Sequence, residues 1–88
     1  MMKKKQQPTG MGKLTYEDGS FYEGPVVKGR REGKLGIMHY TDGKVYMGEW
    51  RRDMREGRGL LKLADTNTKL CCGVFREDHF LDDKHQLW

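Results

Sequence analysis

The sequence predicts an all-β protein, a single twisted antiparallel sheet of stacked β-hairpins with a short C-terminal tail or helix. Three observations support this fold class. Glycine is abundant, with 12 residues against two prolines, and glycine weakens helix interiors. Asp-Gly pairs at 18–19 and 42–43 separate short apolar segments, which is a strong hairpin signal. The motif Tyr22-x-Gly24 returns 24 residues later as Tyr46-x-Gly48, which indicates an internal repeat.

Each strand is expected where apolar and polar residues alternate between turn signals. On the central segment, Tyr46, Gly48 and Trp50 share one face of the predicted strand. The pattern predicts six strands, near 11–16, 20–27, 34–41, 44–51, 58–64 and 69–75. We therefore divide the chain into a basic N-terminal tail at 1–9, expected to be disordered, a repeat sheet at 10–75, and a capping or docking segment at 76–88.

Composition places the chain among small single domains. The 88 residues carry a net charge of +4, which favours anionic partners without selecting one class. Cys71 and Cys72 are adjacent, so they point to opposite faces of a strand and predict no disulfide, as in a reducing compartment. The sequence shows no signal peptide and no apolar run of about 18 residues, so we expect an intracellular, cytoplasmic protein.

The recurring glycines and aromatic residues resemble the MORN-repeat family. The intact copy reads Tyr46, Gly48, Trp50, Gly57 and Gly59, and the flanking copies are less complete. The resemblance covers about residues 10–75, and its structural positions are Gly10, Gly12, Tyr16, Tyr22, Gly24, Tyr46, Gly48, Trp50, Gly57, Gly59, Gly73 and Phe75.

The copy that begins at Tyr22 departs from this pattern in two ways. Val26 stands in the place of the tryptophan, and the glycines at 33 and 36 are spaced by three residues instead of two. The extra residue predicts a longer turn or a β-bulge near Lys34.

The resemblance implies a function in binding. Proteins with such repeats act as adaptors in cytoskeletal, ciliary and membrane-junction assemblies, so we expect a non-enzymatic scaffold subunit, located at the cytoskeleton, cilium or flagellum. Two alternatives stay open: a peripheral membrane module that binds anionic phospholipids, and a regulatory or targeting subunit of a separate enzyme. A short repeat stack also has exposed end strands, which favours protein partners and leaves self-association open.

Basic residues gather in equivalent turns of two successive copies. Equivalent turns stack on one edge of the sheet, so these side chains are predicted to form a basic ridge. The ridge is interpreted either as solvated or partner-facing charge, or as a site for anionic lipid. Its members are Lys28, Arg30, Arg31, Arg51, Arg52, Arg55 and Arg58.

Other site types lack their required residues. The glycines follow the strands and form no phosphate-binding loop, so no cofactor is expected. The aromatic residues recur with the hairpins, which favours a core over base stacking, and no nucleic-acid partner is expected. The spacing of His79, Asp82, Asp83 and His85 matches no metal motif, and no catalytic constellation is visible.

The C-terminal segment carries its own signal. Apolar residues there recur at helical spacing, which weakly predicts an amphipathic helix. We interpret the segment either as a cap on the last strand or as a docking element for a partner, and these readings have equal weight. The docking candidates are Phe80, Leu81, Leu87 and Trp88.

Overall fold

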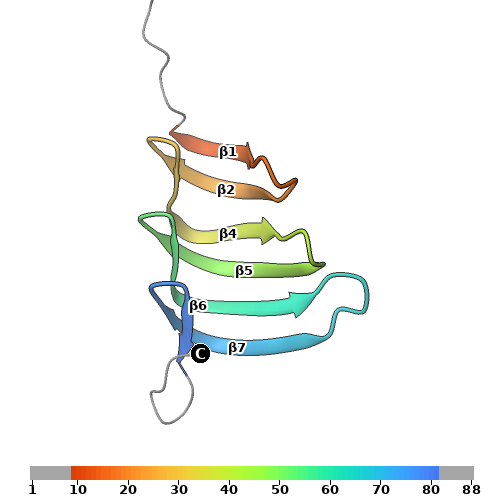
Figure 1. Ribbon diagram of the computed structural model, residues 1–88. Helices are drawn as coiled ribbons and strands as arrows, with labels where there is room; N and C mark the ends of the chain where they lie inside the picture. The colour runs from red at the N-terminus through yellow and green to blue at the C-terminus, as the bar shows by residue number, and fades with distance from the viewer. Residues whose placement is uncertain (1–8, 82–88) are drawn as a thin grey trace, which may run out of the picture.

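The structure, a computed structural model, describes residues 9–81 and shows one open antiparallel sheet, which confirms the predicted fold class. The long strands follow chain order, and hairpin is stacked on hairpin (Figure 1). They are β1 (Gly10–Thr15), β2 (Phe21–Val27), β4 (Gly33–His39), β5 (Lys44–Arg51), β6 (Met54–Leu63) and β7 (Lys69–Arg76). Two short strands, β3 (Arg30–Arg31) and β8 (His79–Leu81), pair with the ends of β2 and β7.

Tight turns at 28–29, 52–53 and 77–78 lie together at the same ends of the strands (Figure 1). We call this side of the sheet the turn edge. Both central residues of each turn have positive φ, as with Arg52 at 51° and Asp53 at 70°. This is the backbone of a type I′ turn, whose twist matches that of the flanking strands. The repeat therefore closes each hairpin in the same way, and it does so with non-glycine residues in the second and third copies.

Longer loops at 16–20, 40–43 and 64–68 lie at the opposite edge. The first two have the Asp-Gly sequence and the same hydrogen bonds, because Asp18 Oδ1 accepts from Ser20 N–H and Asp42 Oδ1 accepts from Lys44 N–H. An aspartate that bonds to the backbone two residues later stabilises a turn locally. The Asp-Gly signals thus mark hairpins, as the sequence predicts.

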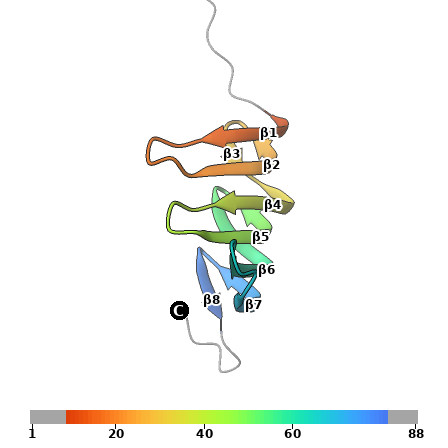
Figure 2. The ribbon, with the colours of Figure 1, turned by 90° about the vertical axis from the view of Figure 1, so that its right-hand side faces the viewer.

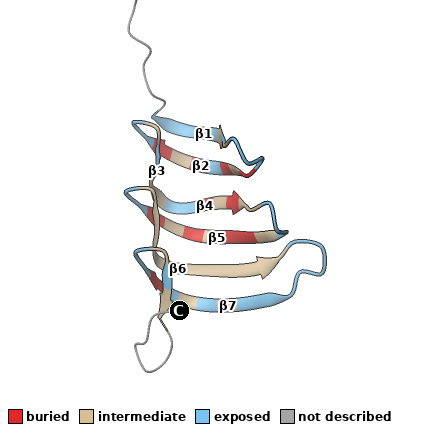
Figure 3. Cartoon of the chain, in the orientation of Figure 1, coloured by how far each residue is buried: buried red, intermediate tan, exposed pale blue. Residues whose placement is uncertain are grey.

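The core is a row of aromatic rings on one face of the sheet, here called the aromatic face. Tyr22 meets the edge of Trp50, which meets Tyr46, which in turn meets Phe75, with ring centroids 5.0–5.4 Å apart. All four side chains are buried, and the buried positions concentrate on β2, β4 and β5 (Figure 3). Edge-to-face contacts of this kind add to the free energy gained by burying each ring. Val26, which stands in the place of a tryptophan, is also buried in this row.

The two central tyrosines lie flat across glycines of the neighbouring strands. Tyr46 Oη donates a 2.9 Å hydrogen bond to Glu49 O, and a Cβ added to Gly59 would lie 2.2 Å from that hydroxyl. Tyr22 repeats the arrangement over Gly36. Burial raises the pKa of Tyr22 to about 12, against a weaker opposing effect of the nearby arginine. Glycine is required here because any side chain would occupy the volume of the ring.

The pairing register shifts at three places, one of them between Leu61 and Lys62 where β6 pairs with β7. The shift between Gly33 and Gly36 on β4 is the bulge that the three-residue glycine spacing predicts. A second shift lies on β6, where Gly48 pairs with Gly59 but Trp50 pairs with Arg55. Strand β6 also begins at Met54 instead of near 58, because the tight turn at 52–53 lets the chain resume pairing with β5 at once.

The C-terminal segment continues the sheet before the described part of the chain ends. Strand β8 pairs with β7 (Figure 2). The ring centroid of Phe80 lies 5.3 Å from that of Phe75. The predicted helix is therefore wrong for residues 79–81, since hairpin pairing overrides a weak helical period. The rest of the predicted helix, with Leu87 and Trp88, lies outside the described residues, as do residues 1–8 of the basic tail.

Candidate functional site

Arg31 on β3 folds back over the aromatic face instead of joining the surface ridge. Its backbone N–H and Nε donate to Asp53 Oδ1 at 3.1 and 2.7 Å, and its Nη2 donates to Asp53 O at 2.7 Å. Its guanidinium lies 4.4 Å from the centroid of Trp50. The side chain is 16% exposed. A planar guanidinium can make these hydrogen bonds and still stack on a ring.

Arg55 repeats every part of this arrangement one copy later. Its backbone N–H and Nε donate to Asp78 Oδ1 at 2.8 and 3.4 Å, and its Nη2 donates to Asp78 O. Its guanidinium lies over Phe75, the positional equivalent of Trp50. We call each of these interactions an arginine clasp. Arg31 and Arg55 thus belong to the repeat core, and this use leaves them unsuited to the anionic-partner site for which the sequence suggested them.

In the first clasp, Asp53 and Arg31 each stabilise the charged form of the other. Partial burial alone would raise the pKa of Asp53, but the hydrogen bonds and positive charge of Arg31 outweigh it and lower the pKa below its ordinary value. Burial likewise opposes the charge of Arg31, while Asp53 raises its pKa above the usual range. Both groups are therefore ionised at neutral pH, and the clasp is an ion pair as well as a hydrogen-bond network.

Four of the remaining ridge candidates stay at the surface of the turn edge. Lys28, Arg30, Arg51 and Arg52 are exposed there, in or beside the first two turns. Arg58 is exposed too, but it pairs with Val74 in the middle of the sheet and lies on the face opposite the aromatic rings. The structure therefore brings four of the seven predicted residues together at one edge and separates the other three from them.

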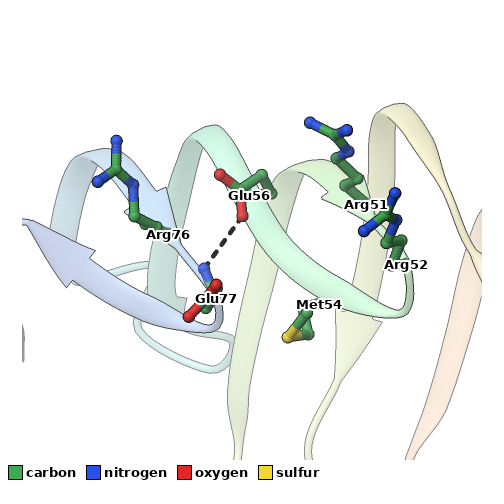
Figure 4. Close-up of a pocket in the computed structure, with 6 residues that line it drawn as sticks. All are labelled: Arg51, Arg52, Met54, Glu56, Arg76 and Glu77. Atoms are coloured by element: carbon green, nitrogen blue, oxygen red, sulfur yellow. Dashed lines mark hydrogen bonds between the residues drawn. The ribbon is translucent and has the colours of Figure 1, made fainter.

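One further cation at this edge was not among the residues predicted from the sequence. Arg76 ends β7 directly before the third turn, in the position that Arg51 holds before the second turn. A shallow hollow lies between these two turns, and Arg51 and Arg76 project on either side of Glu56 (Figure 4). Aligning the third copy on its turn, rather than on its missing tyrosine, would have identified Arg76.

Two acidic side chains at the turn edge accept hydrogen bonds from backbone N–H groups. Glu56 Oε1 accepts from Glu77 N–H at 3.1 Å, as the dashed line in Figure 4 shows. Glu32 Oε1 makes the equivalent bond to Arg52 N–H at 2.9 Å. Each glutamate therefore secures the turn of the next copy beside an arginine clasp. Their carboxylates also neutralise part of the basic charge at this edge.

Groups with reactive or metal-binding chemistry are sparse in the described residues. No cluster of three or more His, Cys, Asp or Glu side chains able to hold a metal ion occurs between residues 9 and 81. Cys71 and Cys72 are free thiols, and burial raises the pKa of Cys71, which disfavours its reactive thiolate. In the same part of the chain, no helix is long and apolar enough to cross a membrane.

The C-terminal docking candidates that the structure describes are in contact with the sheet. Phe80 extends the aromatic row, and Leu81 pairs with Val74. Phe80 occupies the position of Arg31 and Arg55 in the third turn, so the clasp is replaced there by an aromatic contact.

Comparison with known protein families agrees with this geometry. No curated protein matches the chain significantly. The MORN repeat family model matches residues 7–21 and 46–68, which include the first half-repeat and the intact central copy. These matched segments supply Tyr46 and Trp50 of the aromatic row and the Gly59 on which Tyr46 lies. The aromatic row, the glycines beneath it and these two matches together identify the chain as a MORN-repeat protein.

Proposed function

We propose that this chain is a non-enzymatic, protein-binding subunit of a larger assembly, cytoskeletal or ciliary in kind. MORN repeats are binding modules for proteins and membranes and are not a known enzyme family. The observation that carries the proposal is the single-layer sheet, in which all the described buried apolar side chains except Val45 form one cluster on one face. A sheet packed on one face offers a broad surface and gains stability when a partner covers it.

Affinity purification of the whole chain from native extract tests this proposal. We expect structural proteins to be retained in amounts comparable to the chain and to resist a moderate salt wash. A destabilised chain, Trp50→Ala, serves as the control, because proteins captured by both forms recognise unfolded polypeptide. If the folded chain retains nothing that the control does not, the proposal is wrong. Retention of a catalytic subunit instead would identify the chain as a regulatory or targeting subunit of an enzyme.

A second candidate function is recognition of anionic phospholipid at the turn edge. The hollow between Arg51 and Arg76 supports it, since two guanidinium groups flank an open space and Arg52 lines the same hollow. Arginine forks bind phosphate oxygens in pairs of parallel hydrogen bonds. Glu56 and Glu77 also line the hollow, and their carboxylates weaken its attraction for anions.

Vesicle co-sedimentation distinguishes the lipid function from protein binding. Vesicles with and without phosphoinositide are mixed with the chain across a salt series. Reversal of charge at Arg51, Arg52 and Arg76 to glutamate is expected to abolish sedimentation with phosphoinositide vesicles. Lys69→Glu, at the far end of β7, is the control and should leave it unchanged. Sedimentation that survives the triple reversal rules out the lipid site.

A further inference from the structure

The face opposite the aromatic rings, here called the outer face, carries an apolar row that crosses four strands. Ile37 on β4 pairs with Met47 on β5, Met47 pairs with Leu60 on β6, and Leu60 pairs with Cys72 on β7. Direct cross-strand partners point to the same side of a sheet and touch. At about 4.8 Å between strands, the row is about 14 Å long. It is thus a contiguous feature and not a set of scattered apolar residues.

This row forms the floor of a shallow groove. One hollow is lined by Leu35, Leu60 and Cys72, a second by Ile37 and Val45, and the two share Met47. Leu35 at the rim is 57% exposed. The described clasps and short strands lie against the aromatic face, as the contacts of Arg31 and Phe80 show, so they do not cover the groove.

Basic side chains border the groove on both sides. Lys34 and Arg58 line one hollow, and Lys62 lines the other and pairs with Lys69 on the next strand. Within residues 9–81, none of these four cations forms an ion pair.

The two carboxylates that line the groove already have partners. Glu49 Oε2 accepts from Arg58 N–H at 2.6 Å, and Glu23 Oε1 lies 3.4 Å from His39 Nε2. The border is therefore an electropositive frame around an apolar floor.

We propose that the outer face of β4–β7 docks an acidic amphipathic helix of a protein partner, a proposal that rests on the protein-binding function above. Apolar side chains of the helix fill the groove, and its flanking carboxylates meet the cations on either border. A helix spans the row in about ten residues, so three turns suffice. Covering an open sheet face with a helix is also the common way in which folds bury such a face.

The positive charge of the groove border and the exposure of its side chains favour an acidic helix over two other occupants, a second copy of the chain and a lipid bilayer. A second copy of the chain would bring two electropositive frames together, and like charges across an interface cost free energy. Insertion into a bilayer needs apolar side chains that stand above the charged ones. At most positions here the reverse holds, because Ile37, Met47 and Leu60 are half-buried while Lys34, Arg58 and Lys69 are exposed. The exceptions are Cys72 of the row, which is exposed, and Lys62 of the border, which is half-buried.

The test titrates the whole chain with a designed helical peptide of about 18 residues, leucine on one face and glutamate on both flanks. Binding is followed through backbone amide resonances. We expect the largest shifts at Ile37, Met47, Leu60 and Cys72. A peptide with lysine in place of glutamate should not bind. Equal binding of both peptides, or shifts centred on Tyr22, Tyr46 and Trp50, would overturn the proposal.

Charge reversal locates the site. The double variant Lys62→Glu, Lys69→Glu is expected to weaken binding by at least about tenfold, a change of about 1.4 kcal/mol. The control Lys28→Glu, Arg52→Glu makes the same change in net charge at the turn edge. It should fold normally, because Glu77 already occupies the equivalent turn position with the same positive φ. If both double variants weaken binding equally, the peptide senses only net charge and the groove is not its site.

The apolar floor is tested by a second matched pair. Leu35→Ser removes an exposed rim side chain of the groove, whereas Leu70→Ser removes one that is 44% exposed and does not line it. Only the first should weaken peptide binding. Anionic phosphatidylserine vesicles form the last arm, and vesicle binding that is lost in Lys62→Glu, Lys69→Glu would assign the face to membrane instead. If these outer-face variants still capture the extract partners of the native chain, the outer-face assignment fails while the protein-binding function stands.

Discussion

Arg31 and Asp53 are 22 residues apart in the chain and form one bonded unit. Arg31 Nε lies 2.7 Å from Asp53 Oδ1, the backbone N–H of Arg31 donates to the same carboxylate oxygen, and the backbone N–H of Asp53 donates to Arg31 O. Arg55 and Asp78 repeat the unit in the next copy. Each clasp joins the strand that leaves one tight turn to the tight turn of the next hairpin. The clasps therefore fix how successive hairpins stack, which sheet pairing alone leaves less tightly defined.

Removal of the clasp arginine should destabilise the whole sheet. Arg31→Met keeps an apolar stem over Trp50 but leaves Asp53 without its donors, and we expect a loss of about 1–3 kcal/mol in the free energy of unfolding. Urea denaturation followed by circular dichroism measures it. Arg30→Met, an exposed neighbour, should change stability by less than about 0.5 kcal/mol. Equal effects of the two substitutions would show that the clasp does not stabilise the fold.

Lowering the pH should remove the stabilisation that the carboxylate of Asp53 provides. The pKa of Asp53 is lowered in the folded state, so its stabilisation is fully present above the ordinary aspartate value of 3.8. This stabilisation is lost as the pH falls below 3.8 and through the lower pKa that Asp53 has in the folded chain. Unfolding free energies of the native chain and Asp53→Asn, measured from neutral pH down into this window, should converge as the pH falls. Parallel curves would contradict the assignment.

Glycines beneath the tyrosines should not tolerate a methyl group. In Gly59→Ala the new Cβ would lie 2.2 Å from Tyr46 Oη, and we expect a cost of about 1–3 kcal/mol. Gly12→Ala is the matched control, because its Cβ would meet only Val26 Cγ2 at an ordinary 3.6 Å. Thermal unfolding compares the two variants. A Gly59→Ala chain as stable as Gly12→Ala would mean that the ring does not require this glycine.

Trp50 should be the most costly single side chain to remove. It is 3% exposed, contacts Tyr22 and Tyr46, lies under Arg31, and donates from Nε1 to Gly36 O at 3.1 Å. We expect Trp50→Ala to cost at least about 3 kcal/mol and to unfold a sheet with so thin a core. Circular dichroism and amide dispersion report this directly. A folded, stable Trp50→Ala chain that merely lost binding would make Trp50 a ligand residue instead.

Much of the fold was predictable because its signals are local. Asp-Gly loops and alternating apolar residues located the six long strands, and the spacing of Gly33 and Gly36 predicted the bulge on β4. The early start of β6 was missed, since Arg52-Asp53 lacks the glycine or asparagine that usually marks a type I′ turn. Alignment with Lys28-Gly29 in the first copy would have located it.

The candidate sites were less predictable, because charge in a sequence does not say which way a side chain turns. Arg30 and Arg31 are neighbours of the same type, yet Arg30 is exposed and Arg31 lies over Trp50. Arg58 has the same charge as the ridge residues and lies on another face, which follows from strand parity once the register around the shift on β6 is known.

The sequence by itself determined the hairpin repeat, the aromatic positions of the core and the family, because periodicity and turn chemistry depend on residues close together in the chain. Only the tertiary structure decided that Arg31 and Arg55 join Asp53 and Asp78, and that Ile37, Met47, Leu60 and Cys72 form one row. Both features join residues of different strands, and their partners are set by pairing register and side-chain direction. A basic residue of the repeat therefore stabilises the fold or faces a partner according to how the hairpins stack.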